Sequence, residues 1–504
     1  MTNDVPPNDV LPGDDARGGH GPALRRDLYA VGAAALLVVA AVLVGDALED
    51  RTGSLRVGRP PLLATWEPHV GPGTPAAVAV AVAVIAYGVP LAARLPWRRL
   101  LFAVWGAAAA WTWSLALVDG WYRGVAEQLT TRNEYLRAVG RFHDIPAALR
   151  DFTHHILIDA PGNWPAHVAG HPPAATVTFV LLDRIGLGGG GWAGVFVITV
   201  GTTAPAAVLV AVRALVAERP ARRAAPFLAL APGAVWVGTS ADGYFAAVAA
   251  WAVALLALAV TGHRPGATGF ASGLLFGLTA YLSYGLTLFA VIAAAVLLLG
   301  SRRTRPPISL LALLPAGLAV VPAVFTALGF DWWAAYRLLV IRYHQGAGGV
   351  RPYGYWVWAN LACTVFVVGP ATAAGLRRTA ARLRHTGAAF TSGRAKAADA
   401  RRGGTTPEPT PEPAGTTPEP AGAVTEPGRT GAGAVRLGLL VAAALLALLV
   451  ADLSGMSKAE TERIWLPFAW WLLPACAFLP GRRGWLAAQA SLALLVNHLL
   501  LTGW

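Results

Sequence analysis

Residues 100–118 of the chain read LLFAVWGAAAAWTWSLALV, and the next residue is Asp119. A helix rises about 1.5 Å per residue, so this run is long enough to cross a hydrocarbon core of roughly 30 Å. Similar apolar runs of about 17 to 25 residues recur along almost the whole chain. The sequence therefore predicts an all-α polytopic membrane protein with about 13 to 15 membrane segments, some of them short or broken.

The composition excludes an ordinary soluble enzyme. Hydrophobic residue types make up 55% of the chain and charged residues 13%, with a mean hydropathy of +0.52, whereas soluble domains carry roughly 25% charged residues. The net charge of +13 comes almost wholly from arginine, because Lys396 and Lys458 are the only lysines. The arginines cluster beside apolar runs, where they mark cytoplasmic helix ends. This placement indicates no nucleic-acid partner. The clusters are Arg25/Arg26, Arg94/Arg98/Arg99, Arg302/Arg303/Arg305, Arg377/Arg378/Arg382/Arg384 and Arg482/Arg483.

The pattern of apolar and polar stretches predicts four regions. The first 25 residues mix acids and bases, unlike a cleavable signal peptide, so we expect the first helix to stay in the membrane. The run TTPEPTPEPAGTTPEPAG is too polar and Pro-rich to bury a core, which predicts a disordered spacer. The regions are a cytoplasmic tail over 1–27, a membrane domain over 28–376 with outer loops 119–172 and 331–355, a disordered cytoplasmic linker over 377–436, and C-terminal membrane helices over 437–504.

The path between residues 173 and 305 is ambiguous. A membrane segment over Pro173–Leu182 would end inside at Asp183 and Arg184, but the basic residues after Val216 then fall on the wrong side. We expect residues 192–216 to form two short helices, since Gly201 and Pro205 lie mid-length. Residues 269–300 also resemble a broken pair, interrupted near residues 281–284. Within loop 119–172, the apolar spacing predicts surface helices over 124–142 and 147–158.

Polar side chains concentrate on the predicted outer side. Asp119 ends a membrane segment, and a carboxylate at the edge of the hydrocarbon region suits a general base for a hydroxyl acceptor. The alternative is an acid that only marks the end of the segment. A candidate site should therefore open to the outside of the membrane.

The 119–172 loop holds further candidates for substrate binding, namely Glu134, His167 and His171. His171 precedes Pro172 and Pro173, which predict a rigid helix start. We favour His171 as a hydrogen-bond donor to a sugar or a phosphate. The four-residue spacing of the histidines could also bind a metal on one helical face, but the prolines disfavour that helix.

Later loops supply another acid and three arginines. Asp242 lies in an outer turn, Arg342 and Arg351 lie in the 331–355 loop, and Arg463 stands where the chain re-enters the membrane. Arginine at headgroup depth suits a lipid phosphate. Ser457 and Glu460 fit a capping box, which is a structural alternative to a role in binding.

Several kinds of site are not indicated. The sequence has no Walker loop, no dinucleotide fingerprint and no HExxH, and its outer loops lack an Asp-x-Asp pair. The two cysteines, Cys363 and Cys476, lie inside apolar segments and imply no disulfide or metal framework. We expect no cofactor and no metal ion.

The order of these parts resembles the GT-C superfamily of integral membrane glycosyltransferases, closest to actinobacterial members that use polyprenyl-phosphate sugars. The likeness covers residues 100–305 well and the rest loosely, with the first two segments as an N-terminal addition. The resemblance implies that Asp119 is the catalytic base, that His171-Pro172-Pro173 matches the family's H-P-P segment, and that Arg463, or Arg342 and Arg351, holds the lipid phosphate. Two departures are Gly120 after the acid and Ala174 after the prolines.

The resemblance implies an inverting transfer of sugar from a polyprenyl-phosphate donor to a cell-envelope glycan or lipid acceptor, by a multi-pass protein of the cell membrane surrounded by membrane lipids. A transporter or lipid flippase is the first alternative, because broken helices suit transport. A non-catalytic scaffold that recruits a partner through its linker is the second.

Overall fold

A computed structural model describes residues 20–301, 308–402 and 427–502 of the protein, and most of these residues are helical. Two short strands, β1 (Ala64–Trp66) and β2 (Leu500–Thr502), pair antiparallel with Ala64 opposite Thr502. The α-helices are α1 (His20–Thr52), α2 (Thr74–Arg94), α3 (Trp97–Ala116), α4 (Ile145–Asp151), α5 (Ala166–Gly170), α6 (Ala174–Arg184), α7 (Gly190–Gly201), α8 (Ala204–Leu215), α9 (Glu218–Ala229), α10 (Ala234–Val237), α11 (Ala241–Val260), α12 (Pro265–Leu282), α13 (Phe289–Ser301), α14 (Ile308–Ala327), α15 (Trp332–Gln345), α16 (Ala347–Val350), α17 (Tyr353–Arg402), α18 (Pro427–Leu453), α19 (Thr461–Ile464), α20 (Leu466–Ala469) and α21 (Arg482–Leu499).

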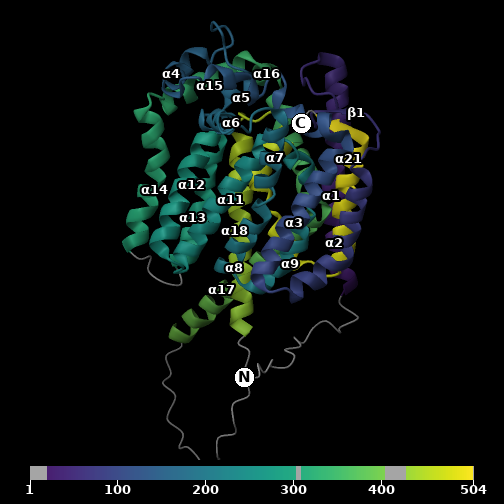
Figure 1. The fold of residues 1–504 in the computed structure, drawn as a ribbon. Helices are drawn as coiled ribbons and strands as arrows, with labels where there is room; N and C mark the ends of the chain where they lie inside the picture. The colour runs from purple at the N-terminus through teal and green to yellow at the C-terminus, as the bar shows by residue number, and fades with distance from the viewer. Residues whose placement is uncertain (1–19, 302–307, 403–426, 503–504) are drawn as a thin grey trace, which may run out of the picture.

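The helices form a bundle of membrane-spanning length (Figure 1). Within the described residues, eight helices are long and apolar enough to cross a membrane, and shorter apolar helices cover Tyr284–Gly300 and Leu466–Phe478. Large apolar side chains on the outer helices are exposed, such as Leu36 on α1 and Ile308 on α14. Lipid tails rather than water suit such a surface. The predicted all-α polytopic class is confirmed.

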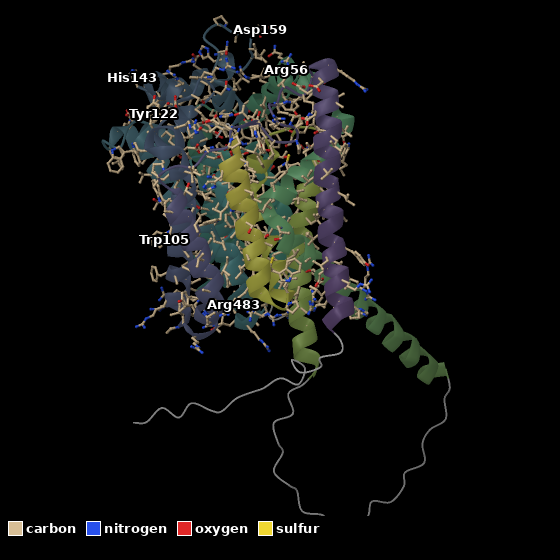
Figure 2. The ribbon with its side chains drawn as sticks, turned by 90° about the vertical axis from the view of Figure 1, so that its right-hand side faces the viewer. Arg56, Trp105, Tyr122, His143, Asp159 and Arg483 are labelled. Carbon is tan, nitrogen blue, oxygen red and sulfur yellow. The ribbon has the colours of Figure 1, made fainter. Side chains whose placement is uncertain are left out.

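The two ends of the bundle differ in chemistry. Figure 2 shows Arg56, His143 and Asp159 at one end, which we call the loop end, and Arg483 at the other, which we call the basic end. At the basic end, buried Asp27 of α1 pairs with Arg377 and Arg378 of α17 at 2.7 and 2.6 Å. By the positive-inside rule, we expect the basic end to face the cytoplasm.

Helix α11 runs through the centre of the bundle and is the most enclosed of the long helices. Its sequence, ADGYFAAVAAWAVALLALAV, is mostly alanine and valine, so neighbouring helices α7, α8, α12 and α13 pack close to it. Ser240 caps its first turn by accepting a hydrogen bond from the Asp242 N–H at 3.1 Å. The rigid central helix therefore holds Asp242 at the loop end.

Helix α17 is broken at Gly369, whose φ of 75° lies in the left-handed region. The side chain of Gln489 on α21 repairs the break, because its Oε1 accepts from the Ala371 N–H at 3.2 Å and its Nε2 donates to the Val368 carbonyl at 2.8 Å. A β-carbon at residue 369 would collide with this side chain. A neighbouring helix thus satisfies the freed backbone groups, as a membrane interior requires.

The predicted membrane segment over Pro173–Leu182 is wrong. Helix α6 has only 11 residues, and both of its ends stay beside the 119–172 loop. His171 contacts Tyr135 just before the helix, and Arg184 at its end donates to the carbonyls of Phe142 and His143 at 3.1 and 2.8 Å. Helix α6 therefore lies at the loop end (Figure 1), which removes the ambiguity in the path.

Other breaks fall where the sequence places them. Helices α7 and α8 meet at Thr202–Thr203, as expected, and together form one apolar span, Gly190–Leu215. Helix α12 ends at Leu282 and the chain turns at Tyr284. The region predicted as a helix over 124–142 forms short 3-10 and π turns instead. The region predicted as a helix over 147–158 overlaps α4, which begins two residues earlier, and a 3-10 turn.

Both ends of the predicted 377–436 linker are helical where the structure describes them. Helix α17 continues to Arg402 and α18 begins at Pro427. The proline-rich run of the prediction, and the N-terminal tail up to residue 19, lie outside the described residues.

Candidate functional site

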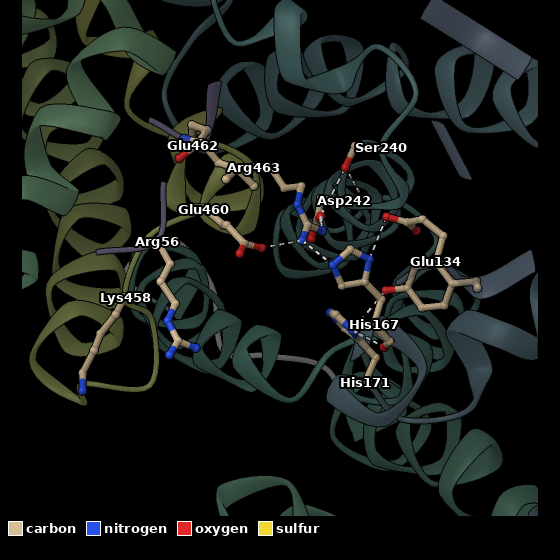
Figure 3. Close-up of polar contacts among 12 residues, drawn as sticks. Arg56, Glu134, His167, His171, Ser240, Asp242, Lys458, Glu460, Glu462 and Arg463 are labelled. Atoms are coloured by element: carbon tan, nitrogen blue, oxygen red, sulfur yellow. Dashed lines mark hydrogen bonds and ion pairs between the residues drawn. The ribbon is translucent and has the colours of Figure 1, made fainter. Parts of the chain in front are cut away.

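A network of charged side chains lies at the loop end, where residues far apart in sequence meet (Figure 3). Glu134 and His167 come from the 119–172 loop, Asp242 from the first turn of α11, and Glu460 and Arg463 from the turn between α18 and α20. All of these residues except Glu460 are buried. Four of the site residues predicted from sequence are therefore in one cluster.

Arg463 is the hub of this network. Its two terminal nitrogens lie 2.6 Å from Asp242 Oδ2, 2.9 Å from His167 Nε2 and 3.1 Å from Glu460 Oε2. Burial alone would lower the pKa of the guanidinium, but the carboxylates of Asp242 and Glu460 outweigh it and raise that pKa. Arg463 is therefore a permanent charge, and both of its terminal nitrogens bond side chains of the protein.

His167 has a defined proton position. An arginine nitrogen only donates, so Nε2 of His167 accepts from Arg463, and the ring proton sits on Nδ1. Nδ1 lies 2.7 Å from Glu134 Oε1. The ring thus bridges a buried arginine and a buried carboxylate, and Glu134 orients it.

His171 offers a free nitrogen to a ligand. Its Nδ1 lies 2.8 Å from the His167 carbonyl and 3.0 Å from the Tyr135 hydroxyl. A carbonyl only accepts, so Nδ1 carries the proton, and Nε2 is an acceptor that makes no hydrogen bond to a described residue. Burial lowers the pKa of His171 to about 4, so the ring is neutral at pH 7. The sequence predicted a donor; the structure presents an acceptor.

Asp119 lies in a second, more open cluster. Its Oδ1 lies 3.0 Å from His69 Nε2 and 2.9 Å from an Arg123 nitrogen, and Arg123 also bonds Glu67 at 2.8 Å. The π turn over residues 122–126 places Arg123 one turn after Asp119. The other oxygen of Asp119 has no partner among the described residues, and the side chain is 18% exposed. A substrate can therefore reach Oδ2.

The loop between α1 and α2 joins the two clusters. Its Leu63 N–H donates to the carboxylate of Glu462 at 3.2 Å, and its His69 contacts Asp119. Strand β1 of this loop pairs with β2 at the end of α21. On the other side, Thr239 next to the Asp242 turn donates to the Gly124 carbonyl at 2.5 Å. The clusters are thus parts of one packed surface.

Sequence reasoning missed His69 and Glu67, because the loop over 46–74 lies outside the region of the family resemblance. The available signal was a histidine and an acid two residues apart in an outer loop. Glu460 was treated as a helix cap, but it has a left-handed backbone and its side chain bonds Arg463.

Arg342 and Arg351 hold loops together. Arg342 donates to the carbonyls of Ile156 and Trp164, which ties α15 to the 119–172 loop. Arg351 donates to the carbonyls of Leu55 and Lys458 at 2.9 and 2.7 Å, which ties the α1–α2 loop to the turn before α19. Their donors are largely committed to backbone oxygens.

The described residues contain no group of three histidine, cysteine or acidic side chains that could hold a metal ion. The rings of His167 and His171 are about perpendicular, at 85°. Their nitrogens contact Glu134, Arg463 and Tyr135 and do not point to one position that a metal ion could occupy.

Comparisons with known proteins give a limited likeness. No protein-family model and no curated protein matches the chain. Two crystal structures of the Archaeoglobus fulgidus oligosaccharyltransferase are similar at 14% identity. The one tethered with an acceptor peptide containing the NVT sequon has a TM-score of 0.41 over 79% of this chain and 54% of that chain. The complex with Zn and sulfate has a TM-score of 0.33 over 72% and 52%. The chain spans about half the length of these structures.

Proposed function

We propose that the protein is a membrane glycosyltransferase that moves a sugar from a polyprenyl-phosphate donor to a cell-envelope acceptor at the loop end of the bundle. The observation that carries this proposal is the Asp119 carboxylate. It lies at the end of a membrane helix. One oxygen accepts from Arg123 and faces the His69 ring, and the other has no partner among the described residues. A positioned carboxylate of this kind suits proton removal from a hydroxyl.

In the proposed reaction, Asp119 Oδ2 takes the proton of the acceptor hydroxyl. The acceptor oxygen forms a bond to the anomeric carbon, and the bond from that carbon to the phosphate oxygen breaks with its electron pair on the lipid phosphate. The His69 Nδ1 proton is donated to the Glu67 carbonyl at 2.6 Å, so its Nε2 faces Asp119 as an acceptor. His69 faces Oδ1 and not Oδ2, so the ring can receive the proton that Asp119 removes once the carboxyl group has turned about its Cβ–Cγ bond.

The buried network positions the sugar-binding surface in this proposal. The network fixes His167 through Glu134 and Arg463, and Arg463 is held in turn by Asp242. The His167 carbonyl then accepts from the His171 ring and orients it. His171 Nε2 then accepts a hydrogen bond from a sugar hydroxyl. Arg342 and Arg351 act as positioning residues, because their donors fasten the surrounding loops.

The transporter alternative predicts an open path along the broken helices. The break in α17 is instead sealed by Gln489, and the charged network lies at the loop end, where Figure 1 shows α5 with His167 in it. Transport sites usually lie near mid-bilayer. This geometry supports the enzyme over the transporter.

The proposal is tested by native mass spectrometry of the gently purified protein. We expect a polyprenyl-phosphate sugar to co-purify, and to be more abundant in Asp119→Asn because transfer is blocked while binding remains. Asp144→Asn is the matched control, since Asp144 is an exposed helix cap at the same end and asparagine caps equally well. A transport substrate in place of a lipid-linked sugar, in both variants, would overturn the proposal.

A further inference from the structure

Two turns at the loop end share an unusual backbone. Only five non-glycine residues of the described chain have a positive φ, and three of them are Arg56, Ala459 and Glu460, at 53°, 70° and 62°. A fourth, Thr239, adjoins the Asp242 turn. Left-handed backbone is unfavourable for residues with a β-carbon and clusters at functional sites. This backbone is therefore concentrated around one site.

Charged side chains hold the Arg56 turn from both sides. The Glu49 carboxylate accepts from the N–H groups of Leu55 and Arg56 at 2.6 and 3.1 Å. Arg351 donates to the carbonyls of the same two residues at 2.9 and 3.4 Å. The turn is therefore fixed by its backbone, which leaves the Arg56 side chain with no structural duty in it.

The two turns face each other through Arg351. This buried guanidinium also donates to the Lys458 carbonyl at 2.7 Å and lies 3.5 Å from Glu460 Oε1. Figure 3 shows the side chains of Arg56 and Lys458 on one side of Glu460, with His167 and His171 on the other side. Two separate loops thus bring a guanidinium and an ammonium to the edge of the charged network.

Both cations keep donors that no described residue occupies. The Arg56 side chain is exposed and contacts no described acceptor, and Lys458 donates a single bond, to the Gly348 carbonyl at 2.8 Å. In contrast, Arg463, Arg342 and Arg351 are committed to protein oxygens and a histidine nitrogen. Two carboxylates lie near the pair. Glu460 is compensated by Arg463 and Arg351, and Glu49 accepts from the N–H groups of Leu55 and Arg56.

We propose that Arg56 and Lys458 form a phosphate-binding site, and that it takes the phosphate of the lipid-linked donor; the second part rests on the proposed function. A guanidinium matches two phosphate oxygens in a fork, and an ammonium adds a point charge. Arg56 belongs to the loop between α1 and α2, so the N-terminal helix pair contributes directly to the substrate site.

The test measures binding of three probes to the full-length protein in detergent: undecaprenyl phosphate, undecaprenol and inorganic phosphate. The variants are Arg56→Gly, which removes the guanidinium and suits the left-handed backbone, and Lys458→Gln. Arg59→Gln is the matched control, because Arg59 is an exposed arginine of the same loop. Thermal melting checks that each variant is folded.

We expect the dissociation constant for undecaprenyl phosphate to rise at least tenfold in Arg56→Gly and in Lys458→Gln, and to change less than twofold in Arg59→Gln. Competition by inorganic phosphate that also depends on Arg56 would assign the site to free phosphate, and its absence would assign it to the lipid headgroup. Unchanged binding in Arg56→Gly, or equal binding of undecaprenol, would overturn the phosphate site. Asp119→Asn should bind normally, so a failure of catalysis is distinguishable from a failure of binding.

Discussion

At the residue scale, Arg463 connects three loops by itself. Removing one member of a buried ion pair leaves its partners charged and unpaired, which costs about 3–5 kcal/mol. We expect Arg463→Ala to lower the free energy of unfolding by this amount, as measured by denaturant or thermal melting in detergent. Arg483→Ala, at an exposed site that donates one bond to the Ala86 carbonyl, is the control and should melt within a few degrees of the native protein. Equal melting temperatures of Arg463→Ala and Arg483→Ala would show that Arg463 does not hold the network together.

His69 makes a separable prediction at the same scale. His69→Gln keeps a polar side chain but cannot take up a proton, so we expect kcat to fall about tenfold with little change in KM. The dependence of kcat on pH distinguishes proton transfer from packing. If His69 transfers a proton, the part of this dependence that comes from His69 should be absent in His69→Gln. An unchanged profile with a raised KM would make His69 a packing residue only.

Glu462 predicts a pH dependence of stability. Burial raises the pKa of this carboxyl to about 7, and its Oε1 accepts from the Leu63 N–H. Between about pH 4.5 and pH 7 the folded state holds a proton that the unfolded state has lost, so stability falls as pH rises through this window. The melting temperature of the native protein should decline from pH 5 to pH 8, and that of Glu462→Gln should decline less. An equal decline of the melting temperature in the native protein and in Glu462→Gln would show that Glu462 is not the group responsible.

Residue types and spacing were enough to select Asp119, Glu134, His167, Asp242 and Arg463 as candidates. They were not enough to assign roles, because roles depend on partners from distant segments. Arg351 illustrates the limit: its sequence position suits a phosphate, but carbonyls of Leu55 and Lys458 occupy its donors. Nothing in one sequence pairs residue 351 with residue 55.

At the element scale, α6 carries the clearest test of topology. Both native cysteines are buried, so a new surface thiol can be labelled with little background. We expect Arg184→Cys to react with a membrane-impermeant maleimide in intact cells, because α6 lies at the loop end. Arg264→Cys, in the turn between α11 and α12, should react only after permeabilisation. If Arg184→Cys reacted only after permeabilisation, residues 173–182 would cross the membrane, and our placement of α6 would be wrong.

The apolar runs predicted most long helices because a bilayer demands about 20 consecutive apolar residues. Short elements followed other rules. Residues 173–182 are apolar enough for a membrane segment, yet they form a helix of 11 residues whose end is fixed by Arg184. That hydrogen bond to a loop about 40 residues earlier is invisible to hydropathy.

At the scale of the whole molecule, the asymmetry between the two ends is the central property. The basic end has arginine-rich turns and the Asp27 ion pairs, whereas the loop end gathers both charged clusters. The proposed function requires this asymmetry, because it places the reaction on one side of a membrane and the reactive part of the substrate at the membrane surface.

The most direct test of this account is to incubate the purified protein in proteoliposomes with lipid-linked sugars and acceptor from its native membranes, and to follow polyprenyl phosphate by mass spectrometry. Release of polyprenyl phosphate by the native protein and by Asp144→Asn, with a fall of about 100-fold or more in Asp119→Asn, is the predicted result. Movement of intact lipid-linked sugar across the bilayer without release of polyprenyl phosphate would contradict the account.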